Sequence, residues 1–164
     1  MSEKYVIMFV CTGNTCRSAM AQGALRTLLE KERPGKFEVI SSGTGAASGF
    51  PATIYAVEAA KIWDCDISRH MSQPITSALI DKSDLILALT PSHYKQILKL
   101  RADARERTYL VEKFPTPGGD GEGIDDPIGQ SLDRYNETFL LIGEYLGQYV
   151  SEIVKRIDEK LDAS

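Results

Sequence analysis

The chain has 164 residues, of which 43% are hydrophobic and 26% are charged, and its formal net charge is −4. This length and composition predict one globular domain over residues 1–164 and exclude a disordered chain. The acidic balance excludes a general nucleic-acid binder or membrane-surface binder, so an anionic ligand would have to be attracted by a local site.

Three cysteines are too few for a disulfide scaffold, and this count fits a reducing compartment, so we expect a cytoplasmic protein. No apolar stretch has membrane-spanning length. Nothing in the sequence requires more than a monomer.

Short apolar runs alternate with helical patterns along the chain. We expect strands over 5–10, 37–40, 84–89 and 107–111, and helices over 18–32, 51–63, 77–82, 91–98 and 131–161. Such alternation predicts an α/β fold, with right-handed crossovers and a four-stranded parallel twisted sheet covered by helices on both faces. Ligands of such sheets bind beyond the carboxyl ends of the strands.

Three further local features refine this prediction. Pro51 is expected at the first position of the second helix, and Thr90 is expected to cap the helix that starts at Pro91. The Gly- and Ser-rich stretch 41–49 is expected to be a loop. In the long last helix, Gly147 is the expected interior weakness.

The stretch Cys11-Thr-Gly-Asn-Thr-Cys-Arg-Ser18 lies between the first strand and the first helix. Backbone N–H groups of such a loop, together with the helix N-terminus, form an anion site that also stabilises a thiolate at its base. Arg17 would bind two oxygens of a phosphate, and Ser18 would hydrogen-bond the Cys11 thiolate or cap the helix. Gly13 permits a positive φ, and Asn14 tolerates one.

The bare spacing of Cys and Arg is a weak signal, and a buried inert cysteine is the alternative interpretation of Cys11. The turn residues and the position between strand and helix favour a nucleophile. Cys16 and Cys65 have Gln22 and Met71 at the corresponding position, so neither repeats the pattern.

The chain resembles the low-molecular-weight protein-tyrosine phosphatases. The resemblance rests on the Cys11–Ser18 stretch and, in family order, on 41–44, 66–70, 84–89 and Asp126-Pro127, so that it covers nearly the whole chain. It implies the flavodoxin-like fold of that family and hydrolysis through a phosphocysteine intermediate, with phosphorylated proteins as substrates and without a metal or other cofactor.

The resemblance also implies residue roles. Cys11 would be the nucleophile, Arg17 would bind the phosphoryl oxygens, and Asp126 would be the general acid and then the general base. The loop residues Thr12, Gly13, Asn14, Thr15, Cys16 and Ser18 would bind substrate or phosphate, with Ser42 supporting their network. Asp125 is assigned to substrate binding, a solvated loop charge being the alternative.

Two departures from tyrosine-selective relatives bear on the substrate. Thr15 stands where those relatives resemble one another in a bulky aliphatic residue, and small or aliphatic residues stand where they carry aromatic ones, namely Ala46, Ala47, Ile128 and Gly129. A phosphotyrosine ring would lose its stacking partners. The pattern is similar to the bacterial protein-arginine phosphatases, so phosphoarginine is the expected substrate and phosphotyrosine the alternative.

Other functions remain open at this stage: a broad acid phosphatase, an arsenate reductase or a non-catalytic phosphate-binding module. An arsenate reductase needs further cysteines to relay electrons, and only Cys16 and Cys65 are available. Cys16 is instead predicted to protect Cys11 as a reversible disulfide partner. Cys65, His70 and His93 are expected to be packing or surface groups.

Overall fold

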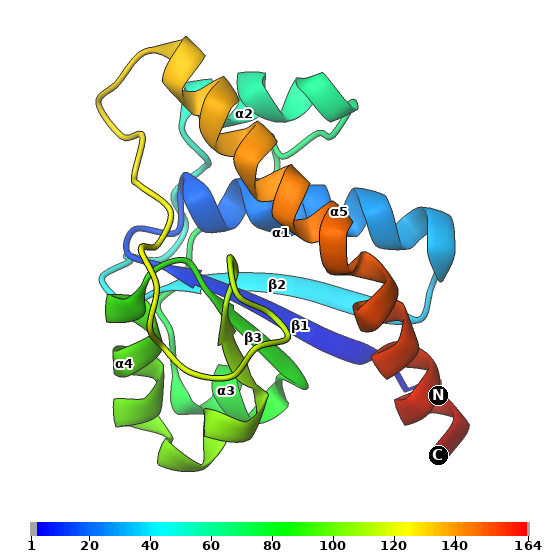
Figure 1. Cartoon of the computed structure of the whole chain (residues 1–164). Coiled ribbons are helices and arrows are strands. Elements are labelled where there is room, and N and C mark those ends of the chain that lie inside the picture. The colour runs from blue at the N-terminus through cyan, green and yellow to red at the C-terminus, as the bar shows by residue number, and fades with distance from the viewer. Residues whose placement is uncertain (1–2, 164) are drawn as a thin grey trace.

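A computed structural model describes residues 3–163. Four parallel strands form one sheet in the order β2-β1-β3-β4 (Figure 1). The strands are β1 Tyr5–Cys11, β2 Phe37–Gly43, β3 Leu85–Ala88 and β4 Thr108–Leu110. The predicted four-stranded parallel α/β fold is therefore confirmed.

Helices cover both faces of this sheet. Figure 1 shows α1, α2 and α5 on one side and α3 and α4 on the other. The α-helices are α1 Arg17–Glu32, α2 Ile54–Ala60, α3 Ser77–Lys82, α4 Pro91–Leu100 and α5 Leu132–Ala163, and the 3₁₀ helices are η1 Lys61–Trp63 and η2 Ala102–Arg107.

The central strand β1 explains why the sheet needs both layers. All seven of its side chains are buried, and successive side chains point to opposite faces. Ile7 and Phe9 belong to the core under α1, α2 and α5, whereas Met8 and Val10 belong to the core under α3 and α4. Because β1 is buried on both faces and ends at Cys11, the loop that follows it begins at the carboxyl edge of the sheet.

Two of the boundaries that differ from the sequence prediction are explained by hydrogen bonds to the Cys11 loop. Strand β2 continues to Gly43, because Thr44 and Gly45 donate their N–H groups to the carbonyl oxygens of Cys11 and Thr12 and keep the chain in register. Helix α2 begins at Ile54 instead of Pro51, because the N–H of Thr53 donates to the carbonyl oxygen of Thr15 and holds the preceding segment against the Cys11 loop.

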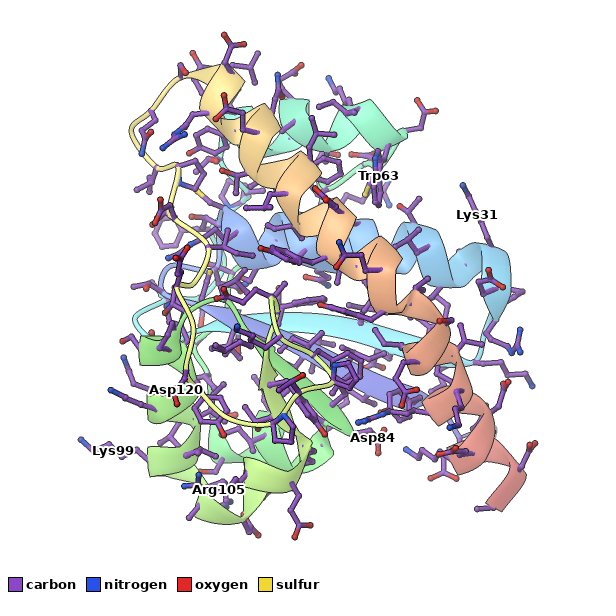
Figure 2. The ribbon with its side chains drawn as sticks, viewed as in Figure 1. Lys31, Trp63, Asp84, Lys99, Arg105 and Asp120 are labelled. Atoms are coloured by element: carbon purple, nitrogen blue, oxygen red, sulfur yellow. The ribbon has the colours of Figure 1, made fainter. Side chains whose placement is uncertain are left out.

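Helix α5 contains two glycines, Gly143 and Gly147, and they lie in different surroundings. A Cβ atom at Gly143 would lie 2.5 Å from the ring of Trp63, whereas nothing lies within 4 Å of one at Gly147. The Trp63 ring also contacts Phe139 edge to face, with the ring centroids 5.4 Å apart, and Figure 2 shows Trp63 on the α5 side of the sheet. Gly143 thus permits close packing and is no weakness.

Within residues 3–163, no helix is long and apolar enough to cross a membrane.

Candidate active site

The loop that joins β1 to α1 lies at the carboxyl edge of the sheet, where a parallel fold places its ligands. It borders a cavity of about 160 Å³, which we call the loop cavity. The lining residues are Cys11, Thr12, Gly13, Asn14, Thr15, Cys16, Arg17, Asp126 and Ile128. Residues separated by more than a hundred positions in the sequence therefore meet around one small space.

Cys11 lies at the end of β1 and its side chain is buried. Its Sγ atom lies 2.8 Å from Ser18 Oγ and 3.3 Å from the backbone nitrogen of Asn14, which donates to it. Both contacts suit a negatively charged sulfur, which accepts hydrogen bonds from N–H and O–H donors.

Asn14 holds the loop in shape. Its φ is 58°, in the left-handed region that few residues other than glycine adopt, and its side chain is fully buried. Its Nδ2 donates to Ser18 Oγ at 2.8 Å, and its Oδ1 accepts from the backbone nitrogen of Gln73 at 2.9 Å. Gly13 was also expected to allow a positive φ, but the left-handed conformation falls on Asn14 alone within this loop.

Ser41, and not Ser42, supports the network. Asn14 Nδ2 donates to Ser41 Oγ at 2.9 Å, and Ser41 Oγ donates in turn to Gln22 Oε1. The prediction for Ser42 was wrong, because Ser42 points to the opposite face of β2 and its hydroxyl donates to Met8 Sδ at 3.3 Å.

Arg17 is the first residue of α1 and is buried beside the loop cavity. Its Nη1 donates to the carbonyl oxygen of Ile124 at 2.9 Å, and its Nη2 lies 3.5 Å from Asp126 Oδ2. Its Nε is buried without a hydrogen-bond partner within residues 3–163. A buried donor left unpaired beside a cavity is suited to an oxygen of a bound anion.

The neighbouring residues Asp125 and Asp126 differ in exposure, and only Asp126 lines the loop cavity. Asp126 lines the loop cavity, as a group that exchanges a proton with the leaving group would have to do, and its Oδ2 lies 3.5 Å from Arg17 Nη2. Asp125 is exposed and lines a second cavity, beside Glu112 and Arg134, and Asp126 borders both cavities. Asp125 therefore lies outside the loop cavity, and its assignment to substrate binding stays a prediction.

Thr15 and Cys16 both line the loop cavity, and Cys16 also contacts two residues that do not line it. Thr53 Oγ1 lies 3.5 Å from Cys16 Sγ, and Tyr135 Oη lies 3.4 Å from it. Burial, followed by the hydrogen bond to Cys16, raises the pKa of Tyr135 to about 12, so this hydroxyl keeps its proton at neutral pH. Helix α5, which carries Tyr135, therefore contacts the loop that joins β1 to α1.

Two histidines that the sequence suggested for packing or the surface contact the loop directly. His93 Nε2 lies 2.8 Å from Thr12 Oγ1, and its Nδ1 lies 3.0 Å from Thr90 Oγ1. Burial and then the charge of Arg17 lower the pKa of His93 to about 4, so the ring is neutral at pH 7. His70 Nε2 lies 2.6 Å from the carbonyl oxygen of Asn14. No local sequence pattern predicts these contacts, because they join segments that are distant in the sequence.

Among residues 3–163, no group of three or more His, Cys, Asp or Glu side chains is arranged to hold a metal ion.

This fold, with a cysteine in an anion-binding loop and a facing aspartate, defines a cysteine-based phosphatase. The chain belongs to the low molecular weight phosphotyrosine protein phosphatase family, whose family model matches residues 6–161. That family acts on phosphorylated protein substrates.

Individual relatives in this family are named for different activities. The chain is 35% identical over 150 residues to a protein-arginine-phosphatase of Bacillus subtilis, covering 91% of this chain and 97% of that one. It is also 35% identical to a probable low molecular weight protein-tyrosine-phosphatase, EpsP, of Ralstonia solanacearum, covering 90% and 94%. An arsenate reductase of Staphylococcus saprophyticus is 33% identical, covering 90% and 97%.

Comparison with a solved structure also supports membership of this family. A mutant of the YwlE arginine phosphatase, with a phosphorylated active-site serine, superimposes with a TM-score of 0.84 and 33% identity, covering 93% of this chain and 99% of that one.

Proposed function

We propose that this phosphatase hydrolyses phosphoarginine in proteins. The observation that supports this substrate most directly is the lining of the loop cavity, where Thr15 contributes a hydroxyl and no aromatic side chain among the described residues takes part. A tyrosine ring gains affinity from flat apolar partners, whereas a guanidinium group is polar and planar and seeks hydrogen-bond acceptors.

In the first chemical step Cys11 Sγ attacks phosphorus. The S–P bond forms as the P–N bond breaks, and Asp126 gives its proton to the departing guanidino nitrogen. The hydrogen bonds from Ser18 and from the backbone of Asn14 favour the attacking thiolate. Arg17 and the loop N–H groups bind the phosphoryl oxygens, whose charge is spread over them in the transition state.

In the second step water attacks the phosphocysteine. Asp126, now ionised, takes a proton from that water, the S–P bond breaks, and Cys11 leaves as a thiolate with inorganic phosphate as the product. The phosphorylated serine in the YwlE mutant shows that the nucleophile position of that relative accepts a phosphoryl group.

Phosphotyrosine is the second candidate. Ile128 is 58% exposed at the edge of the loop cavity, where its apolar side chain would contact a ring. The arsenate reductase alternative receives less support, because Cys65 is buried against Gly23 and lines no part of the loop cavity.

The test is paired hydrolysis of a phosphoarginine peptide and a phosphotyrosine peptide by wild type, Cys11→Ser and Thr15→Ile. We expect the wild type to prefer phosphoarginine, Thr15→Ile to reverse or lose that preference by at least about tenfold in kcat/KM, and Cys11→Ser to be inactive on both. A wild-type preference for phosphotyrosine would overturn the substrate proposal, and turnover by Cys11→Ser would overturn the mechanism.

A further inference from the structure

A second polar cavity, of about 310 Å³, adjoins the network behind the phosphate-binding loop. We call it the rear cavity. Its polar walls include Gln22 and Arg26 from α1, Ser41 from β2, and Arg69, His70 and Gln73 from the segment after η1. It shares no lining residue with the loop cavity. It is therefore a separate space that the proposed chemistry does not use.

Within residues 3–163, Arg26 and Arg69 of the rear cavity make no ion pair, and their guanidinium groups make no hydrogen bond. Arg33 and Arg101, in contrast, pair with Asp158 and Asp81 at 2.8 and 3.0 Å. Two free guanidinium groups on one cavity offer the planar donor pairs that match the oxygens of a phosphoryl group.

The other ionisable groups of this wall leave one positive charge in excess. Asp66 opposes the arginines, and the hydrogen bonds from Ser68 lower the pKa of its carboxyl group, so it is ionised at neutral pH. Burial lowers the pKa of His70, so His70 adds no charge at pH 7. The rear cavity thus favours an anion, and Asp66 limits how tightly one is held.

The polar wall of the rear cavity is also the support of Asn14. His70 Nε2 contacts the Asn14 carbonyl oxygen, the backbone nitrogen of Gln73 donates to Asn14 Oδ1, and Ser41 Oγ accepts from Asn14 Nδ2. Asn14 in turn donates its backbone N–H to Cys11 Sγ. One residue therefore separates the rear cavity from the nucleophile.

We propose that the rear cavity binds a phosphoryl anion between Arg26 and Arg69, either inorganic phosphate or the phosphoryl group of a small phosphate monoester. An anion bound to Arg69 shifts the segment that carries His70 and Gln73. Because both residues hydrogen-bond Asn14, this shift changes the position of Asn14 and the rate of turnover at Cys11. The binding part is independent of the proposed substrate, whereas the effect on turnover rests on the proposed phosphatase mechanism.

The binding test uses the ¹⁵N-labelled full chain carrying Cys11→Ser, which prevents turnover. Inorganic phosphate and, separately, glycerol 3-phosphate are titrated while the Nε–H signals of Arg26 and Arg69 and the amide signal of Gly13 are followed. We expect the arginine signals and the loop amide to saturate with different Kd values. The ligand with the lower Kd at the arginines identifies the source of the phosphoryl group.

Substitutions then separate the two sites. Arg26→Gln combined with Arg69→Gln should remove the second binding curve and keep that of the loop, whereas Asp66→Asn should lower the second Kd about threefold. Arg105→Gln is the matched control, because Arg105 is exposed, makes no ion pair within residues 3–163 and lies in η2, at the lower end of the molecule in Figure 2. It should leave both curves unchanged.

Binding at the rear cavity is overturned if the arginine signals do not shift, if they follow the loop amide with one Kd, or if the second curve survives the double substitution. The effect on turnover is tested by product inhibition. Phosphate should raise KM and lower kcat in the wild type but only raise KM in the double variant, and purely competitive inhibition of both proteins overturns the coupling. An inactive wild type would overturn the proposed function and leave the binding result intact.

Discussion

Cys11 Sγ and Ser18 Oγ lie 2.8 Å apart, and both side chains are buried. Ser18 Oγ also accepts from Asn14 Nδ2, so its own hydrogen is directed to the sulfur. One hydroxyl therefore connects the nucleophile to the residue that shapes the loop, and the pair behaves as a unit.

Ser18→Ala should remove a charge-assisted hydrogen bond to the attacking sulfur. We expect kcat to fall about 10- to 100-fold, because such bonds to charged groups contribute roughly 1.5–3 kcal/mol. The rate of alkylation of Cys11 by iodoacetamide at pH 7 should fall with it. A variant with wild-type kcat and unchanged alkylation would contradict this role for Ser18.

The serines 41 and 42 form a matched pair for testing the support of Asn14. Ser41→Ala should lower kcat/KM several-fold and reduce the free energy of unfolding by about 1 kcal/mol, since Asn14 Nδ2 and Gln22 Oε1 both lose a partner. Ser42→Ala should leave kcat/KM near the wild-type value, because Ser42 contacts Met8 on the other face of the strand. Equal effects of the two substitutions would contradict the assignment of Ser41, and not Ser42, as the support of Asn14.

This pair also shows what sequence could and could not predict. The four parallel strands and the loop after β1 follow from apolar runs, helical periodicity and the turn residues, all of which are local. The choice between Ser41 and Ser42 depends on strand parity, because a shift of one residue moves a side chain to the opposite face. Phe37 and Val39 share a core with Cys11, so the same alternation places Ser41 on the side of the nucleophile.

The histidines illustrate a different limit. His70 and His93 reach the loop across sequence separations of 56 and 81 residues, and no spacing rule connects them to Asn14 or Thr12. Likewise Pro51 carries a helix-start signal, but a hydrogen bond between Thr53 and Thr15 delays α2 to Ile54. Tertiary contacts decided these positions, and local propensity could not show them.

His93 should make stability depend on pH. Its folded pKa of about 4 lies below the ordinary value of 6.5, so the unfolded chain takes up the proton first as the pH falls. Stability is therefore lost between pH 6.5 and 4, and this group alone should lower the free energy of unfolding by about 2 kcal/mol from pH 7 to pH 5. Urea unfolding of wild type and His93→Gln at both pH values measures the difference.

The glutamine variant keeps a side-chain hydrogen-bonding group but cannot take up a proton in this range. Its loss of stability between pH 7 and pH 5 should be smaller than that of the wild type by about the same 2 kcal/mol. If both proteins lose equal stability, His93 does not titrate with the lowered pKa, and the prediction is wrong.

Cys16 is predicted to protect the nucleophile from oxidation. Peroxide converts the Cys11 thiolate to a sulfenic acid, and the Cys16 thiol then attacks that sulfur, so a disulfide forms and water leaves. After equal peroxide exposure, wild type should recover most of its activity with a thiol reductant, and Cys16→Ser should recover little. Cys65→Ser is the control and should behave like wild type, since Cys65 is packed against Gly23 and lines no part of the loop cavity. Mass spectrometry should find a Cys11–Cys16 linked peptide, and its absence would contradict the prediction.

The two glycines of α5 should respond in opposite directions to alanine. Gly147 is exposed, and a Cβ there meets nothing within 4 Å, so Gly147→Ala should raise the free energy of unfolding by about 0.5–1 kcal/mol through helix propensity alone. Gly143→Ala gains the same propensity but drives its methyl group into the Trp63 ring, which is held by Phe139, so a net loss of about 1–2 kcal/mol is expected. Thermal unfolding should separate the two variants by several degrees, with wild type between them. Stabilisation by Gly143→Ala would mean that the Trp63 ring moves aside at little cost, and the close packing of η1 on α5 would then contribute little to stability.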